Sequence, residues 1–203
     1  MNPEPLVAVL DDARRIGLLG PDPVERHIAH SQAWADILTP ASFLDLGSGA
    51  GIPGLVIALH WPTVQGALLD GQLRRAAWLR TAVVRLGLRD RVEVIEGRAE
   101  DLAHDPVLRE RFPLVLARGF GPPSATAECG SGFVAPGGRL SVSEPPGGAG
   151  DRWPVDGLRR IGLEISTQVV QPIASFVILG KHAPLEDEFP RRRNLPLKSP
   201  LWS

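Results

Sequence analysis

The chain has 203 residues, of which 43% are hydrophobic and 22% are charged, close to the values of ordinary globular domains. This length suits one domain, with or without a small extension. The formal net charge of −1 excludes a global electrostatic attraction to nucleic acid, so any RNA-binding surface has to be a local patch. One cysteine, Cys129, excludes an internal disulfide and a Cys-rich zinc site, and the five histidines are scattered. We therefore predict no metal site.

The sequence also predicts the cellular compartment of the protein. No apolar stretch approaches the roughly 20 residues that a membrane-spanning helix needs. The first ten residues contain Glu4 and two prolines, and they lack the basic start and apolar core of a signal peptide. With the single cysteine, these features predict a cytoplasmic protein that does not enter a membrane.

The first forty residues predict two helices, over 3–17 and 22–38. The first places Leu6, Val9, Leu10 and Ala13 on one face. From residue 41 short apolar runs alternate with helical patterns. We expect strands over 41–46, 64–70, 91–96, 112–117 and 139–143, and helices over 51–60, 73–87 and 124–134.

Strands separated by helices are typical of right-handed βαβ units and predict a parallel sheet with helices on both faces. The last two strands, expected over 163–170 and 175–181, are too close for a parallel crossover and should form an antiparallel hairpin. The sequence thus predicts a Rossmann-like α/β fold of the class I methyltransferase type, with a mostly parallel seven-stranded sheet, a C-terminal antiparallel hairpin and N-terminal helices. Expected domain limits are a helical extension over 1–40, a main domain over 41–181 and a basic, proline-rich tail over 182–203.

A glycine-rich loop, residues 45–54 (DLGSGAGIPG), joins the first expected strand to the next helix. Glycines let a ligand approach the backbone, and in open α/β sheets ligands bind beyond the carboxyl ends of the strands. Gly49 to Gly54 fits the dinucleotide pattern G-x-G-x-x-G, with Asp70 following at the spacing of a ribose-binding acid. However, the acid at Asp45 and the glycine at Gly47 make D-x-G-x-G-x-G, the pattern of S-adenosylmethionine (SAM) binders. We predict a SAM pocket that includes Asp45, Gly47, Gly49, Gly51 and Asp70.

Other polar residues follow the expected strands. Asp70 can accept hydrogen bonds from both ribose hydroxyls, and it can also cap the following helix. Ala99 and Glu100 come after the third strand, where they either meet the adenine edge or form a solvated acidic turn. Arg118 ends the fourth strand, where it can face the cofactor's carboxylate or an RNA phosphate.

Five segments resemble the bacterial small-subunit rRNA guanine-N7 methyltransferases, the RsmG family, also called glucose-inhibited division protein B. They are Arg26-His27-Ile28 with Ser31; Asp45 to Gly54; Leu68 to Asp70 with Arg74, Arg75 and Trp78 to Arg80; Gly97 to Glu100; and Arg118 to Phe120. The C-terminus from Phe189 is similar to the family's ending. The resemblance implies a SAM-dependent enzyme that methylates N7 of a guanine in 16S rRNA, with ribosomal RNA or the 30S particle as partner. It also implies cofactor contacts at Gly47, Ile52, Ala99, Glu100 and Arg118.

The chain departs from the family pattern on the substrate side. His30 stands where family members usually have aspartate, and Ala117-Arg118-Gly119-Phe120 replaces S-R-A-F. After the fifth strand, residues 143–148 (SEPPGG) replace a lysine–glycine pair. The N-terminal segment is shorter than usual and lacks the family's Asn-Leu-Thr. These departures leave open a methyltransferase of small molecules and a non-catalytic RNA- or ribosome-binding homologue.

Methylation of guanine N7 uses an unprotonated lone pair, so the resemblance implies catalysis by positioning, and no catalytic residue is assigned. For the substrate we expect His27 to line the base pocket, with a packing role as the alternative. Arg118, Arg191, Arg192 and Lys198 are the expected phosphate contacts, with a solvated tail as the alternative. The sequence predicts neither the target nucleotide nor the oligomeric state.

Overall fold

A computed structural model describes residues 4–202, and the chain divides into two compact units, residues 1–97 and 98–203. The predicted start of the first helix at Pro3 lies outside the described residues. The expected domain limits at 40/41 and 181/182 stay predictions. None of the helices within residues 4–202 is long and apolar enough to cross a membrane.

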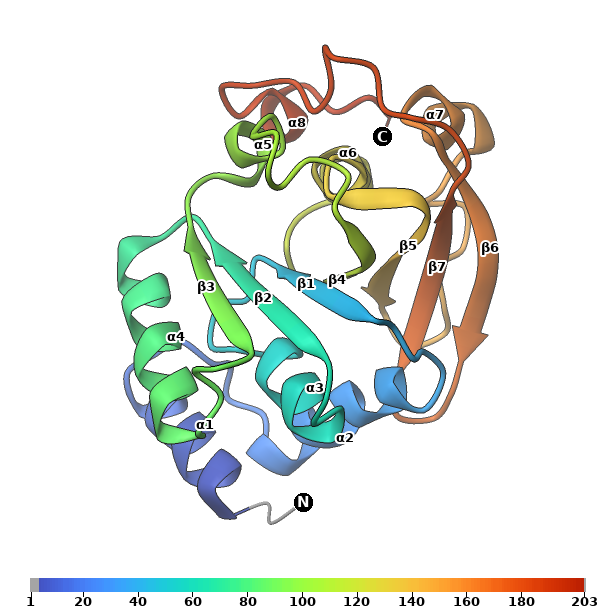
Figure 1. Ribbon diagram of the computed structural model, residues 1–203. Coiled ribbons are helices and arrows are strands. Elements are labelled where there is room, and N and C mark those ends of the chain that lie inside the picture. Colours follow the sequence, from blue (N-terminus) through green and yellow to red (C-terminus); the bar gives the residue numbers. More distant parts are fainter. Residues whose placement is uncertain (1–3, 203) are drawn as a thin grey trace. The chain divides into compact units, whose positions relative to one another are not determined.

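The first unit holds three parallel strands, which lie side by side in the order β3-β2-β1 (Figure 1). They are β1 (Ser42–Leu46), β2 (Gln65–Asp70) and β3 (Val92–Glu96). Leu44 of β1 pairs with Ala67 of β2, which pairs with Glu93 of β3. β1 and β2 are buried almost throughout, as expected of parallel strands covered on both faces. The predictions of these three strands are confirmed to within one residue at each end.

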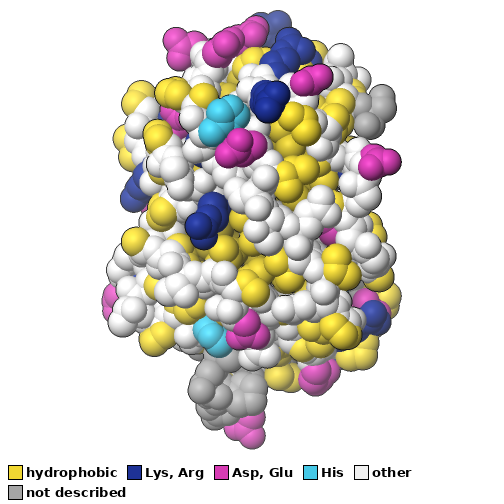
Figure 2. Space-filling view, turned by 90° about the vertical axis from the view of Figure 1, so that its right-hand side faces the viewer, with side chains coloured by type: hydrophobic (Ala, Val, Ile, Leu, Met, Phe, Trp, Pro, Cys, Tyr) yellow, Lys and Arg dark blue, Asp and Glu magenta, His cyan; other side chains and the backbone are white. Residues whose placement is uncertain are grey.

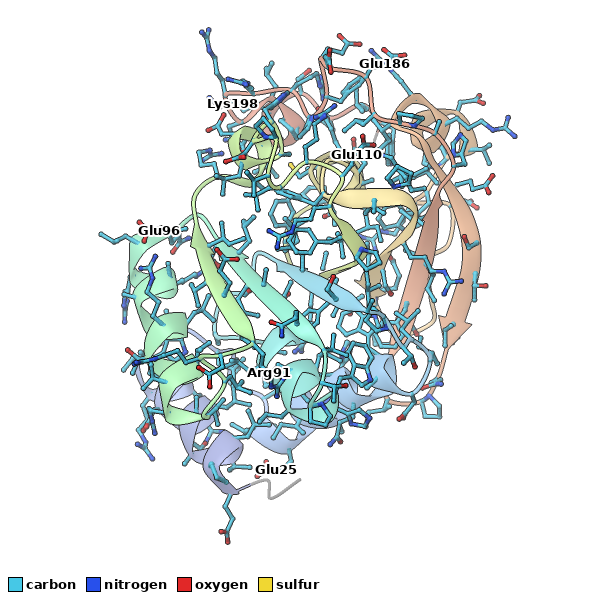
Figure 3. All side chains as sticks on the ribbon, in the orientation of Figure 1. Glu25, Arg91, Glu96, Glu110, Glu186 and Lys198 are labelled. Atoms are coloured by element: carbon cyan, nitrogen blue, oxygen red, sulfur yellow. The ribbon has the colours of Figure 1, made fainter. Side chains whose placement is uncertain are left out.

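Within residues 4–97, four helices complete this unit: α1 (Glu4–Arg15), α2 (Val24–Ala35), α3 (Gly54–His60) and α4 (Leu73–Arg85). α4 packs on β2 and β3, α3 packs on β2, and α2 packs on α3. α1 contacts α2 and α4, and an ion pair of 2.9 Å joins Arg85 to Asp12. Arg91, labelled in Figure 3, donates hydrogen bonds to the carbonyl groups of Trp61 and Val64 at 3.3 Å and so fixes the end of α3. Helix α3 begins three residues later than predicted, because 51–53 form a turn.

The second unit contains β4 (Phe112–Ala117), β5 (Val134–Glu144), β6 (Leu163–Val170) and β7 (Ser175–Lys181), in the order β4-β5-β7-β6. β4 and β5 are parallel, whereas β7 is antiparallel to both β5 and β6. The predicted terminal hairpin is therefore confirmed, with the predicted bounds. The prediction for β5 was too short. The Pro136-Gly137-Gly138 turn lies inside the strand as an irregularity, where the register with β4 shifts between Phe112 and Leu114.

Helices α5 (Ala99–Leu102), α6 (Pro123–Ser131), α7 (Val155–Arg160) and α8 (Leu195–Lys198) belong to this unit. α6 packs on β4 and β5, α7 packs on β6, and α5 and α8 contact α6. Only α6 was predicted, because the other three are too short to display a helical period. Every residue of α6 after Pro123 is buried, Cys129 included. Burial raises the pKa of the Cys129 thiol, which makes it a poor nucleophile.

The C-terminal tail packs within the second unit through a buried ion pair. Arg191 Nε and Nη2 donate to the two carboxylate oxygens of Glu128 at 2.9 and 2.7 Å, and the Arg191 backbone N–H adds a third bond of 2.8 Å. The Glu128 side chain is 0% exposed. In addition, Arg109 donates to the backbone carbonyl groups of Ala103, Leu185, Glu186 and Phe189. Arg191 thus anchors the tail, and 22% of its side chain is exposed. Its predicted contact with a phosphate stays a prediction.

Replacing Arg191 by methionine should lower the free energy of unfolding by about 3 kcal/mol, because the Glu128 carboxylate would stay buried without its partner. Urea denaturation of the full chain measures this change. The matched control is Arg192→Met, at an exposed neighbour, which should change stability by less than about 0.5 kcal/mol. Equal stabilities for the two variants would contradict the anchoring role.

Candidate functional site

The glycine-rich loop between β1 and α3 folds back over the end of β2. The backbone N–H groups of Gly47 and Ser48 both donate to the carbonyl oxygen of Leu69, at 2.8 and 2.9 Å. Gly47, Gly49 and Gly51 have φ values of +71°, +56° and +101°. These values lie in the left-handed region, which glycine adopts at no steric cost, so the loop conformation depends on these three positions.

Asp45 holds the two ends of the loop together. Its Oδ2 accepts the N–H of Gly54 at 2.8 Å, and its backbone carbonyl oxygen accepts the Ser48 hydroxyl at 2.9 Å. The side chain is buried. A Cβ on Gly54 would lie 2.6 Å from Asp45 Oδ2 and 2.3 Å from Leu68 Cδ2, so only glycine fits there. Asp45 was predicted as a cofactor contact, and the geometry makes it a residue that shapes the loop.

The loop offers bare backbone at Gly47 and Gly49, which are partly exposed, whereas Gly51 is buried. A Cβ on Gly49 would meet only the carbonyl oxygen of Gly47, at 3.9 Å, so the space beside Gly49 is open. A Cβ on Gly51 would instead collide with Leu55 at 2.3 Å. Ile52 is buried beside them. The part of the loop that a ligand can approach is therefore the Gly47 to Gly49 turn.

Asp70 ends β2 directly beside this turn. Its Oδ2 accepts the Gly49 N–H and its Oδ1 accepts the Gln72 N–H, both at 2.9 Å. The Arg75 guanidinium lies 3.9 Å from Oδ2, and the Asp70 side chain is 3% exposed. Each oxygen keeps a second lone pair, which is the acceptor set that two ribose hydroxyls require. Asp70 also fixes the backbone that leads into α4, so the capping role and the ribose role are compatible.

His27 lies on the buried face of α2, next to Ile28 and Ser31. Its backbone carbonyl oxygen accepts the Ser31 hydroxyl at 2.9 Å. α2 packs on α3, so this position is that of a packing residue. A role for His27 in a base pocket stays a prediction.

In the second unit, Ala99 and Glu100 open helix α5 and are both buried. Glu100 Oε1 accepts Arg98 Nε at 2.6 Å and the Asn194 N–H at 3.1 Å. The alternative of a solvated acidic turn is therefore wrong, because the carboxylate is enclosed by Arg98 and by the tail. Nothing in these contacts tests the predicted adenine interaction.

A pocket of about 350 Å³ lies at the carboxyl ends of β4 and β5. Arg118, one of the predicted site residues, lines it together with Gly119, Phe120, Gly121, Pro123, Thr126, Val142, Ser143, Glu144, Pro145, Arg152 and Trp153. This volume is at the lower end of the range for pockets that bind small molecules. This location is the usual one for ligands in open α/β sheets.

Glu144 is the buried charge of this pocket. Its Oε2 accepts Arg152 Nη1 at 2.5 Å and its Oε1 accepts Trp153 Nε1 at 2.9 Å. Burial raises the pKa of Glu144, and the bonds from Trp153 and Arg152 oppose that rise. Sequence reasoning did not select these three residues. The one signal available was the departure at 143–148, where this chain has a glutamate in place of the usual lysine–glycine pair.

The basic tail residues have different environments. Arg191 is committed to Glu128, whereas Arg192, Arg193 and Lys198 are exposed, and Figure 3 shows Lys198 at the periphery of the tail. On the face drawn in Figure 2, Lys and Arg side chains are scattered among acidic and uncharged ones. Any phosphate contacts of the tail are thus restricted to a few exposed cations.

Replacing Gly54 by alanine should destabilise the first unit by about 1–3 kcal/mol, because the new Cβ would collide with Leu68 and Asp45. Chemical denaturation followed by circular dichroism measures the change. Gly20→Ala is the control, since a Cβ there would meet nothing within 4 Å. Unchanged stability of the Gly54 variant would mean that the loop relaxes freely.

Comparisons with known proteins identify the family. The sequence profile of the family described as rRNA small subunit methyltransferase G matches residues 19–143. A ribosomal RNA small subunit methyltransferase G of Moorella thermoacetica is 35% identical over 177 residues, which are 82% of this chain and 72% of the relative. A protein of the same name from Roseiflexus castenholzii is 33% identical over 190 residues, 88% of this chain and 79% of the relative.

Solved structures show the fold. An O-methyltransferase from Bacillus cereus in complex with S-adenosylhomocysteine superimposes with a TM-score of 0.63 at 19% identity, covering 88% of this chain and 90% of that one. An O-methyltransferase family protein from Burkholderia thailandensis gives a TM-score of 0.56 at 16% identity, covering 91% and 57%. The fold is thus the mixed seven-stranded α/β fold of class I SAM-dependent methyltransferases, as predicted. By sequence, the chain belongs to the rRNA small subunit methyltransferase G family.

Proposed function

We propose that this protein is a SAM-dependent methyltransferase that methylates N7 of a guanine in small-subunit ribosomal RNA. Family membership over residues 19–143 supports the reaction and the substrate class. The observation that carries the proposal is the Asp70 carboxylate, held 2.9 Å from the Gly49 N–H beside open space at the end of β2. A carboxylate beside a bare glycine turn at this edge of a parallel sheet suits an adenosine ribose.

The residues of the first unit fit this cofactor. Asp70 would accept hydrogen bonds from the two ribose hydroxyls, and Gly47 and Gly49 would allow the ligand to lie against the backbone. Ile52 would supply an apolar wall, and Asp45 would keep the loop in place through Gly54. Contacts to Ala99, Glu100 and Arg118 stay predictions from the family resemblance.

Methyl transfer to guanine N7 requires the protein mainly to position the two reactants. When bound, SAM would supply a methyl group on a sulfonium sulfur, and that sulfur would keep the electron pair of the broken S–CH₃ bond as a neutral thioether. Guanine N7 already carries the lone pair that forms the new N–C bond, so no proton leaves and no general base is needed. The protein's residues must hold the acceptor in line and exclude water, which is the contribution that near-attack geometry makes to rate.

We also propose that the protein meets its substrate in the cytoplasm, as ribosomal RNA or as the 30S particle. The exposed cations Arg192, Arg193 and Lys198 would contact phosphates. Methylation of a small molecule is the second candidate. It is favoured by the pocket of about 350 Å³, whose lining includes Glu144 from the segment that differs from the family pattern after the fifth strand.

Replacing Asp70 by alanine should weaken SAM binding by about 10- to 100-fold, since hydrogen bonds to a charged group contribute about 1.5–3 kcal/mol. Isothermal titration of the full chain with SAM measures this affinity. Asp90→Asn, at an exposed turn of the same unit, should leave it unchanged. If the Asp70 variant binds SAM with the affinity of the wild type, this result would contradict the proposed ribose contact.

The substrate is tested by mapping N7-methylguanosine in 16S rRNA from a bacterial strain that lacks its own enzyme of this family. Expression of the wild-type chain should restore the modification, and expression of Asp70→Ala should not. If the wild-type protein binds SAM but leaves the rRNA unmodified, this result would contradict the rRNA assignment and favour methylation of a small molecule.

A further inference from the structure

The pocket at the ends of β4 and β5 takes part of its lining from the β5–α7 connection, residues 145–154. This connection consists of turns, a bend and irregular backbone, and its three glycines have positive φ values between +55° and +97°. Glycine loses more backbone freedom on ordering than any other residue, so such a segment has little intrinsic preference for one conformation. The places of Arg152 and Trp153, which line the pocket, therefore depend on contacts with residues outside the connection.

Trp202 holds the backbone of this connection. Its Nε1 donates a hydrogen bond to the backbone carbonyl oxygen of Arg152 at 3.1 Å. Its ring lies against α7, where a Cβ on Gly157 would come within 2.5 Å of Trp202 Cε3, so the ring fits because residue 157 is a glycine. The bonds from Arg152 and Trp153 to Glu144 involve side chains alone. The bond from Trp202 thus adds a constraint on the backbone itself.

The same end of the chain also contacts a second part of the pocket lining. The backbone N–H groups of Leu201 and Trp202 donate to Ser124 Oγ at 2.8 and 3.3 Å. Ser124 is buried in α6, between Pro123 and the turn that contains Thr126, and both of these neighbours line the pocket. Trp202 therefore joins the β5–α7 connection to the start of α6.

We propose that Trp202 positions the pocket that receives the methyl acceptor, because it fixes the β5–α7 connection relative to the start of α6. This inference rests on the proposed function, which supplies an acceptor and makes the carboxyl ends of parallel strands its site. Trp202 is not among the residues that line the pocket. It acts through Arg152 and Ser124 and is a positioning residue.

The consequence for the reaction is a cost in acceptor binding when the link is lost. A connection released from Trp202 would sample more conformations, and a bound acceptor would have to order it again. KM for the acceptor should therefore rise while kcat stays the same, the pattern of binding lost equally from ground state and transition state. The SAM site of Gly47, Gly49 and Asp70 belongs to the first unit, so SAM affinity should not change.

The first test is hydrogen–deuterium exchange of the full chain without ligand, followed by mass spectrometry. Trp202→Phe keeps an aromatic ring beside Gly157 and deletes the Nε1–H donor. Amides of residues 145–154 should then exchange about 2- to 10-fold faster, the range that corresponds to one hydrogen bond. Gly157→Ala retains the indole but displaces the ring, so it should give the same result. The matched control is Val155→Ala, an exposed position on α7, which should leave exchange unchanged.

The second test is steady-state methylation of 16S rRNA by the same variants, with SAM affinity measured by isothermal titration. Trp202→Phe and Gly157→Ala should raise KM for the rRNA by about 2- to 10-fold at unchanged kcat and unchanged SAM affinity. Wild-type exchange rates over 145–154 in both variants would overturn the inference. Faster exchange with an unchanged KM, or a parallel loss of SAM affinity, would overturn it too, since either result leaves Trp202 a purely structural role.

The exchange measurement needs no acceptor and so separates the two proposals. If the wild-type protein does not methylate rRNA but the two variants exchange faster over 145–154, the result contradicts the proposed function and supports the link through Trp202. If the wild type methylates rRNA and the variants match it in exchange and in KM, the result contradicts the positioning role alone.

Discussion

The hydrogen bond from the Gly54 N–H to Asp45 Oδ2, 2.8 Å long, is the constraint on which the cofactor loop depends. It spans nine residues and fixes where α3 begins, and so it determines the direction of the turn that contains Gly47 and Gly49. Because that turn passes over the end of β2, the Asp70 carboxylate can reach the Gly49 N–H. The two acids thus have complementary roles in the first unit. Asp45 shapes the loop, and Asp70 accepts a hydrogen bond from its open part.

Buried carboxylates organise the second unit in the same manner. A buried charge is tolerated only where hydrogen-bond donors surround it. Glu100, Glu128 and Glu144 each form an ion pair with an arginine. The consequence is that three arginines, Arg98, Arg152 and Arg191, are used to support acids. Such a chain has fewer cations for nucleic acid than its composition suggests. A general positive field therefore contributes little to the attraction of nucleic acid to this protein.

The sequence was sufficient to predict every strand except the full length of β5, but it was not sufficient to predict the partners of the charged residues. Apolar runs predicted β1, β4 and β7 almost to the residue, because burial on both faces leaves a continuous hydrophobic pattern. Helices α5, α7 and α8 have only 4 to 6 residues and carry no periodic signal. Arg191 was predicted to contact a phosphate. Nothing in the sequence indicated its bond to Glu128, because the two residues are 63 positions apart. Glu144 went unselected for the same reason, since an isolated Glu-Pro-Pro gives no sign that an arginine and a tryptophan enclose the acid.

A carboxylate in the pocket of a transferase is commonly a general base, but Glu144 has no proton to remove if the acceptor is guanine N7. The lone pair that attacks is already free, and the product is a cation that loses nothing. The role that the contacts of Glu144 support is structural, since its carboxylate holds Arg152 and Trp153 beside the pocket. The burial that raises the pKa of Glu144 works against this role as pH falls, because a protonated carboxyl loses acceptor capacity and gains a donor. The bonds from Arg152 and Trp153 oppose that change, so the contacts that hold the side chain in place also favour its ionised form.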